Sequence, residues 1–303
     1  HVVPNPLLLL SPAILRESVA SSEIENIHTT LIDVLENDLF PESERRESDK
    51  EVLRYRDSIL AAFRMLPDVP LCSRMVTAVH ETLLPHLHGE YRRVQNTIAN
   101  TATGETLYTP PVCTELGDLV SNWERFINSD EEGLDPLIKA AIAHYQFEAM
   151  HPFVDGNGRC GRILMVLQLI QDELLEWPIL YISGYINERR ADYYSCLRGV
   201  TTRGDWHAFI RFMLEGFAAQ ALATYTMLKS IMALHEEWRG RLQRDHARIY
   251  SYELVQALFA QPITTPVQLG RMLGIHYTTA SRYLKQLSAA ELLIEKPHGK
   301  YRL

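Results

Sequence analysis

The segment 151–162 brings together residue types that suit phosphate chemistry. Gly156 and Gly158 precede an apolar helical pattern, and the free N–H groups at a helix N-terminus attract an anion. Arg159 and Arg162 are three residues apart, so they share one helix face, and guanidinium groups suit phosphate oxygens. The spacing therefore predicts an anion-binding loop that opens a helix.

Two further side chains in this segment add chemistry to the loop. Asp155 is a hard oxygen ligand of the kind that Mg²⁺ accepts beside phosphates. His151 can take a proton from a hydroxyl when its imidazole is neutral. Taken singly, an aspartate in a turn, a histidine at a helix end and two surface arginines are unremarkable. Their occurrence within one short segment favours a site for phosphoryl or nucleotidyl transfer.

Two helices should position this loop. Asp135 and Pro136 are typical of an N-cap and a first helical residue, and apolar residues then recur at helical spacing to Met150. The helix should end there because the residue before Pro152 disfavours the helical region. A second helix should begin at Asn157.

The residue pattern before these two helices is different. Residues 94–108 alternate extended residues around an Asn/Gly turn, which predicts a β-hairpin, with an irregular surface loop as the alternative. Residues 206–242 indicate one or more long helices. We therefore expect a mainly α fold.

The last part of the chain has a pattern of its own. Helices are expected over 250–259, from Thr265 and over 276–287, with a tight turn at Gly274 between the last two. Short strands are expected at 292–294 and 301–303. Three helices and a hairpin are typical of a winged helix-turn-helix domain. We place the domain boundary between 1–245 and 246–303.

The motif at 151–162, His-Pro-Phe-x-Asp-Gly-Asn-Gly-Arg-x-x-Arg, resembles that of the Fic family at every defined position. The helix before it, the hairpin ending at Tyr108 and the segments 191–194 and 204–206 are also similar to family elements. The resemblance implies a Fic-type helical core with a β-hairpin flap. It implies transfer of AMP from ATP to a Tyr, Ser or Thr hydroxyl of a target protein, with release of pyrophosphate.

The resemblance also implies a role for each position. His151 would be the general base and Asp155 the Mg²⁺ ligand. The backbone of Gly156, Asn157 and Gly158, with the Asn157 side chain, would hold the α-phosphate of ATP. Arg159 and Arg162 would hold the other two phosphates. Tyr194, or alternatively Tyr193, would lie at the adenine. Gly158 stands where a phosphate-transferring subclass carries lysine, which favours AMP transfer.

A second, shorter match lies near the N-terminus. Ser21 to Asn26 fits the family's inhibitory pattern (Ser/Thr)-x-x-x-Glu-(Gly/Asn), in the class whose inhibitory helix precedes the core. Glu25 would then occupy Arg162, the arginine that the γ-phosphate needs. An ordinary solvated helix is the alternative. In relatives the same glutamate also assists removal of AMP from the target, so both uses stay open.

The charge and the cysteine content limit the partners and the compartment that we expect for the protein. The chain carries a net −8, but 246–303 alone carries +4, which indicates two modules with different partners. The four cysteines, Cys72, Cys113, Cys160 and Cys196, form no CxxC pair, which argues against a zinc ribbon and fits a reducing compartment. No secretory signal or membrane-length apolar run is visible. We expect a cytoplasmic protein without a membrane partner.

Three partner predictions follow from this organisation. A target segment would add a strand to the flap at 94–108. The helix 276–287 would face DNA with Arg282 and Lys285, or else make protein contacts. A second copy of the chain, forming a homodimer, is the third candidate partner. The alternative function is a DNA-binding regulator whose Fic domain senses nucleotide.

Overall fold

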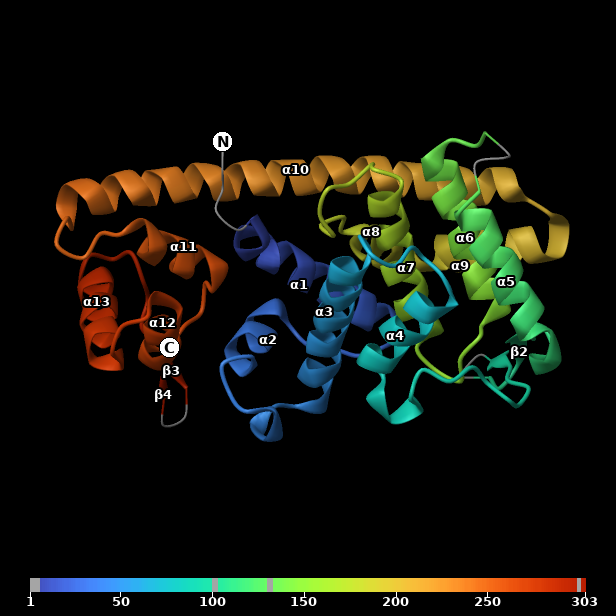
Figure 1. Ribbon diagram of the computed structural model, residues 1–303, viewed down its shortest axis with the longest axis horizontal. Coiled ribbons are helices and arrows are strands. Elements are labelled where there is room, and N and C mark those ends of the chain that lie inside the picture. Colours follow the sequence, from blue (N-terminus) through green and yellow to red (C-terminus); the bar gives the residue numbers. More distant parts are fainter. Residues whose placement is uncertain (1–5, 100–102, 130–132, 299–300) are drawn as a thin grey trace.

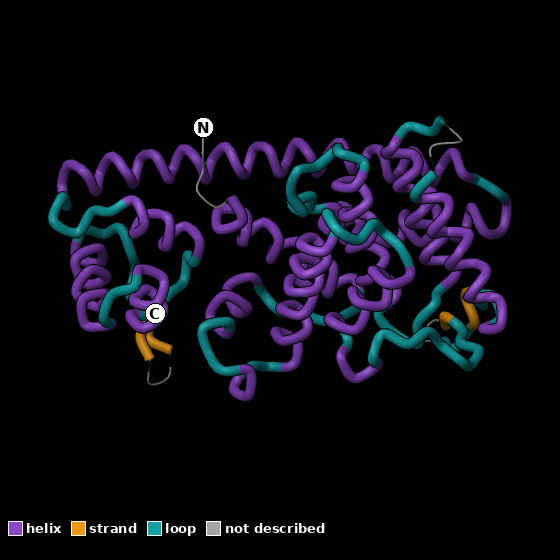
Figure 2. Tube along the Cα trace, in the orientation of Figure 1, coloured by secondary structure: helices purple, strands orange, loops and turns teal. Residues whose placement is uncertain are grey.

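The computed structural model describes residues 6–99, 103–129, 133–298 and 301–303 (Figure 1). The molecule is elongated, and α10 (Trp206–Asp245) runs along its length. The C-terminal helices lie at one end, and the hairpin of β1 (Ile98–Ala99) and β2 (Thr106–Tyr108) lies at the other. Helices account for nearly all regular structure (Figure 2), so the prediction of a mainly α fold is confirmed.

The N-terminal third is a set of helices that packs around the centre of the molecule. Its elements are α1 (Pro6–Ile24), α2 (Leu31–Asn37), η1 (Glu42–Glu44), α3 (Glu47–Met65), α4 (Ser73–Leu83) and η2 (Pro85–Leu87). Helix α1 contacts both α3 and α8 (Ile182–Glu188), and it also contacts α11 (Tyr252–Ala260) at the C-terminal end. One helix thus touches both halves of the chain.

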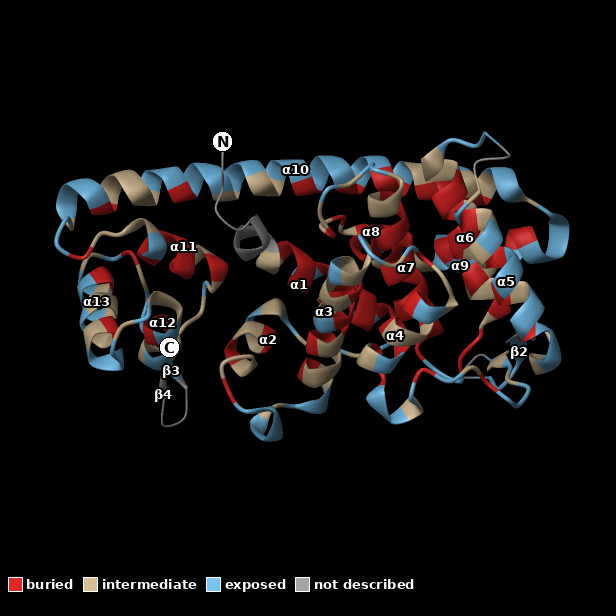
Figure 3. Ribbon diagram, viewed as in Figure 1, coloured by how far each residue is buried: buried red, intermediate tan, exposed pale blue. Residues whose placement is uncertain are grey.

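The central helices carry the motif. They are η3 (Cys113–Glu115), α5 (Leu116–Ile127), α6 (Pro136–Met150), α7 (Asn157–Gln171), α8 (Ile182–Glu188) and α9 (Arg190–Arg203). Almost every residue of α7 is buried (Figure 3), because neighbouring helices cover it on all sides. The predicted N-cap is confirmed, since Asp135 Oδ1 accepts a hydrogen bond from the backbone N–H of Leu137 at 2.9 Å.

The hairpin prediction is confirmed by β1 (Ile98–Ala99) and β2 (Thr106–Tyr108). They pair antiparallel, with Ile98 opposite Tyr108. Residues 100–102, part of the predicted flap, lie outside the described residues. The hydroxyl of Tyr108 donates to the backbone oxygen of Ala149 at 2.8 Å, which ties the hairpin to the end of α6.

The C-terminal elements are α11 (Tyr252–Ala260), α12 (Pro266–Leu273), α13 (Tyr277–Ala289), β3 (Pro297–His298) and β4 (Tyr301–Arg302). They have their own hydrophobic core, which includes Leu254, Leu269 and Leu287. The turn at Gly274 is confirmed by its left-handed φ of 64°. The winged helix-turn-helix assignment stays a prediction.

The strand expected at 292–294 is wrong. Glu291 adopts a left-handed φ of 58°, and the backbone N–H of Leu292 donates to the oxygen of Leu287 at 2.9 Å. These residues therefore form the turn that follows α13, and Leu292 joins the core of the C-terminal domain. Pairing begins later, at Pro297.

Candidate active site

The loop between α6 and α7 is shaped by two left-handed residues. His151 ends α6 at φ 48°, and Gly156 precedes α7 at φ 79°. A side chain on Gly156 would also place its Cβ only 2.7 Å from Leu84 Cδ1. Asn157 accepts from the N–H of Phe153 at 2.8 Å and donates to its oxygen at 2.9 Å. The side-chain amide of Asn157 thus shapes the loop. The backbone N–H of Asn157, at the start of α7, is left for an anion.

Two residues outside the motif support this loop. His80 Nε2 lies 2.9 Å from the backbone oxygen of Asp155, and its ring stacks on Phe153 at 3.6 Å. Arg92, which is 3% exposed, donates from Nε to the oxygen of His151 at 2.9 Å. His80 belongs to α4 and Arg92 lies between η2 and β1, so these contacts fix the two ends of the loop against segments that precede the hairpin.

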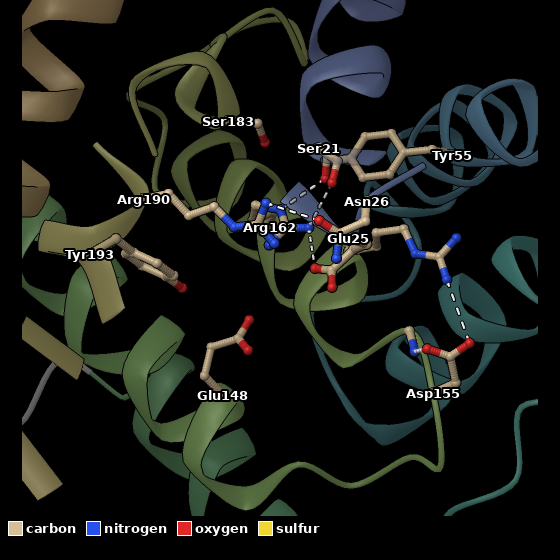
Figure 4. Close-up of polar contacts among 12 residues, drawn as sticks. Ser21, Glu25, Asn26, Tyr55, Glu148, Asp155, Arg162, Ser183, Arg190 and Tyr193 are labelled. Carbon is tan, nitrogen blue, oxygen red and sulfur yellow. Dashed lines mark hydrogen bonds and ion pairs between the residues drawn. The ribbon is translucent and has the colours of Figure 1, made fainter. Parts of the chain in front are cut away.

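The second motif arginine is completely enclosed. Arg162 is 1% exposed, and its Nε donates to Ser21 Oγ at 2.8 Å. Its Nη2 donates to Glu25 Oε1 at 2.8 Å and to the backbone oxygen of Ser21 at 3.0 Å (Figure 4). The structure therefore brings Glu25 to Arg162, as the family resemblance implies, and adds Ser21 of the same pattern to the contact.

Glu25 and Arg162 each stabilise the ionised form of the other. Burial tends to raise the pKa of Glu25, but the Arg162 guanidinium outweighs it, and the net pKa is lowered. Burial tends to lower the pKa of Arg162, but Glu25 and other acidic groups raise it further above its usual value. Both groups are therefore ionised at neutral pH.

Gly158 explains how Glu25 reaches the loop. A Cβ at Gly158 would lie 2.5 Å from Glu25 Oε1 and 3.0 Å from Arg162 Nη1. The carboxylate thus lies over the first turn of α7, where the sequence predicts an anion. Asn26 follows with a left-handed φ of 62°, a conformation that glycine and asparagine tolerate best, and its Oδ1 accepts from Arg190 Nη1 at 3.3 Å.

The first motif arginine also has an acidic partner, which the sequence did not indicate. Arg159 Nη1 donates to Glu51 Oε2 of α3 at 2.7 Å, and Arg159 is 3% exposed. Its Nη2 lies 3.8 Å from Asp155 Oδ2. Glu51 therefore holds the guanidinium beside the predicted metal ligand.

Asp155 is open to a metal ion, since its side chain is 66% exposed. In the part of the chain that the structure describes, no three His, Cys, Asp or Glu side chains form a metal-binding group. Mg²⁺ in nucleotide sites commonly uses one or two carboxylates with phosphate oxygens and water. The single carboxylate at the edge of the anion loop fits that mode of binding.

Buried titratable groups surround the arginines. Burial lowers the pKa of His151, and it raises the pKa of Glu148 to about 7. Glu148 points from α6 toward Arg162 (Figure 4). Burial lowers the pKa of His144 to about 3, and its Nε2 lies 2.8 Å from the hydroxyl of Tyr193. His144 and His151 are thus neutral at pH 7.

A cavity of about 740 Å³ opens between the hairpin, α6 and α9. Tyr194, Glu148 and Tyr108 are among its lining residues. Tyr194 is 46% exposed, whereas Tyr193 is buried in the core. Thr201 also lines the cavity, where its Oγ1 lies 2.9 Å from the hydroxyl of Tyr145. The volume falls in the range of small-molecule sites.

Comparisons with known families agree with this geometry. The sequence profile of the Fic/DOC family matches residues 70–169, and that of the Fic/DOC family N-terminal region matches residues 1–64. Residues 234–303 match the profile described as protein adenylyltransferase SoFic-like, C-terminal domain. The chain belongs to the Fic/DOC family.

Individual relatives are similar over part of the chain. The protein adenylyltransferase Fic of Drosophila grimshawi is 31% identical over 145 residues, which cover 46% of this chain and 27% of that protein. Its counterpart in Drosophila melanogaster is 30% identical over 156 residues, 50% of this chain and 29% of that one. The chain thus spans less than a third of these curated relatives.

Solved structures share the fold. A Fic family protein from Desulfovibrio desulfuricans G20 has a TM-score of 0.60 at 24% identity, covering 98% of this chain and 87% of that one. Fic-1 from C. elegans, residues 134–508, has a TM-score of 0.53 at 21% identity, covering 74% and 72%. The prediction of a Fic-type core is therefore confirmed.

Proposed function

We propose that the chain is a protein adenylyltransferase that transfers AMP from ATP to a hydroxyl of a target protein. One observation carries the proposal: the carboxylate of Glu25 lies over the first turn of α7 and pairs with Arg162. The loop thus holds anionic oxygen where the family motif predicts the triphosphate. The names of the Drosophila relatives support AMP transfer as the reaction.

In this mechanism the α-phosphate lies on the N–H groups of 156–158, with Arg159 and Arg162 on the other phosphates. The target hydroxyl attacks the α-phosphorus, the bond to the bridging oxygen breaks, and pyrophosphate leaves. His151 takes the hydroxyl proton. Mg²⁺ held by Asp155 would neutralise charge on the leaving phosphates. The target segment would pair with the hairpin as an added strand.

We also propose that Glu25 is an inhibitory residue. Arg162 cannot bind Glu25 and the γ-phosphate through the same Nη2 at once, and a side chain lying over Gly158 fills the space that phosphate needs. Nucleotide must therefore displace the carboxylate or bind in a shifted pose. The resemblance gives the same group a second use in removing AMP.

The reaction is tested by intact-mass analysis of the Glu25→Gly variant after incubation with ATP and Mg²⁺, alone and with a lysate. The result that supports the proposal is addition of one AMP to the protein itself or to a lysate protein. Loss of AMP from a pre-modified target, without any addition, would instead indicate an AMP-removing enzyme. If the variant binds ATP but neither adds nor removes AMP, the result favours the nucleotide-sensing regulator.

The pH dependence of the reaction should follow His151. Burial lowers its pKa below 6.5, so the imidazole is neutral at pH 7, and activity is lost only when it becomes protonated at lower pH. We expect kcat/KM of Glu25→Gly to stay constant between about pH 7 and 8 and to fall below about pH 6.5. Half-maximal activity above pH 7 would assign the proton transfer to another group.

The C-terminal domain could bind DNA only after a rearrangement. Tyr277, Thr278 and Ser281 at the start of α13 line a cleft of about 910 Å³ whose other wall is the loop 38–45. Lys296 forms an ion pair with Glu36 at the end of α2. The start of α13, which would enter the major groove of DNA, is therefore covered on one side by this loop. We propose that DNA binding requires the domain to leave this loop.

The expected result is weak binding of duplex DNA by the full chain and tighter binding by Glu36→Gln, because the substitution weakens the contact with Lys296. Affinity should fall steeply with salt, and replacing Arg282 and Lys285 with alanine should flatten that dependence. Gel shifts at low salt measure both. If neither form shifts DNA, protein contact is the better role for this domain.

A further inference from the structure

Helix α1 carries a third polar residue on the face that reaches the site. Glu17, Ser21 and Glu25 are spaced by four residues, so they lie along one side of the helix and its end. Ser21 and Glu25 contact Arg162, but Glu17 does not. Glu17 is 1% exposed, and the inhibitory pattern assigns it no role.

Its carboxyl group instead joins three helices. Oε1 accepts a hydrogen bond from the hydroxyl of Tyr55, on α3, at 3.2 Å. Oε2 accepts from the backbone N–H of Ser183, on α8, at 3.0 Å, and the Ser183 hydroxyl donates to Oε1. Tyr55 and Ser183 are themselves fully buried, and Figure 4 shows them on either side of Ser21.

Burying the carboxyl group of Glu17 is energetically unfavourable, which indicates that its hydrogen bonds have a specific role. Burial of a carboxyl group without a cation in direct contact is unfavourable, and burial raises the pKa of Glu17 to about 7 although Ser183, Arg162 and Tyr55 lower it. An apolar side chain would fill the same space without this cost. The hydrogen bonds, however, fix α1 in rotation and in height relative to α3 and α8.

We propose that Glu17 is a positioning residue for inhibition: it fixes the last turns of α1 on α3 and α8, so that Ser21 and Glu25 are held against Arg162. The proposal rests on the inhibitory role proposed above for Glu25. It makes the inhibitory device a face of three residues, of which only two touch the arginine.

The test compares two backgrounds. Glu17→Ala leaves Tyr55 and Ser183 without their acceptor and should loosen the end of α1. We expect AMP transfer to rise about fivefold in the otherwise unchanged chain. In the Glu25→Gly background the same substitution should have no effect, because no carboxylate is left to position. Glu17→Gln keeps the volume and one acceptor and should give a smaller rise; it serves as the test variant if the alanine variant does not fold.

Glu23→Ala is the matched control. Glu23 is exposed, yet it also bridges α1 and α8, through a hydrogen bond from Asn187 Nδ2 at 2.8 Å. Removing it should leave AMP transfer unchanged. A rise as large as that of Glu17→Ala would overturn the specific role of the buried carboxyl group.

Hydrogen exchange supplies a readout that does not depend on activity. In Glu17→Ala the backbone amides of 21–27 should exchange faster, while those of α7 keep their protection. Unchanged exchange at 21–27, or an equal loss of AMP transfer in both backgrounds, would overturn the proposal. If Glu25→Gly itself transfers no AMP, the proposed reaction fails, and the exchange result still decides whether Glu17 fixes the inhibitory segment.

Discussion

Replacing His151 with alanine should lower AMP transfer by ~10²–10⁴-fold while leaving ATP binding nearly intact. The imidazole lies at the end of α6, and the anion-binding N–H groups and arginines belong to α7 and the residues before it. The substitution thus removes the proton acceptor without removing a phosphate contact. Single-turnover transfer with labelled ATP and a separate nucleotide-binding titration measure the two effects.

His207→Ala is a suitable control, because this exposed histidine lies on α10, outside the loop. It should transfer AMP at the normal rate. Transfer by His151→Ala at an undiminished rate would remove His151 from the mechanism. A large loss of ATP binding would instead show that the residue supports the loop.

Replacing Glu25 with glycine should raise AMP transfer about 10- to 100-fold. A two-state inhibitory contact that leaves 1–10% of molecules open limits the rate by that fraction, and removal of the carboxylate frees Arg162. Initial rates with labelled ATP, compared with the unchanged chain, measure the gain.

Combining Arg162→Ala with Glu25→Gly should abolish the gain. Arg162 is the partner of the carboxylate and, in the proposed mechanism, of the γ-phosphate, so its loss removes both contacts. The two substitutions should be strongly non-additive, as expected for groups that share one contact. If Glu25→Gly leaves transfer flat, the Glu25–Arg162 pair belongs to AMP removal or to stability alone.

Much of the site could be predicted because its parts are close together in the sequence. Asp135, Pro136 and Pro152 set the limits of α6, and the glycines and arginines of one short loop have recognisable spacing. The contact of Glu25 with Arg162 could be predicted only from a family resemblance, and the contact of Ser21 with Arg162 was not predicted. No periodicity links positions so far apart in the chain.

The residues that were missed act through tertiary contacts. Glu51 reaches Arg159, and His80 reaches the backbone of Asp155, from helices that precede the motif by many turns. A glutamate or a histidine on an amphipathic helix has no local pattern that reveals its partner. The misplaced strand at 292–294 has a similar cause, since the apolar run fits a strand as well as the end of a helix that packs into a core.

Helix α1 packs on α11 as well as on the catalytic helices, and this has a thermodynamic consequence. A ligand of the C-terminal domain that alters the placement of α1 would alter the affinity of the phosphate loop for nucleotide. Linkage then requires nucleotide to change the affinity for that ligand by the same factor. Binding at one end of the molecule would then depend on whether the other end is occupied, and the ATP concentration would change the affinity of the C-terminal domain for its ligand.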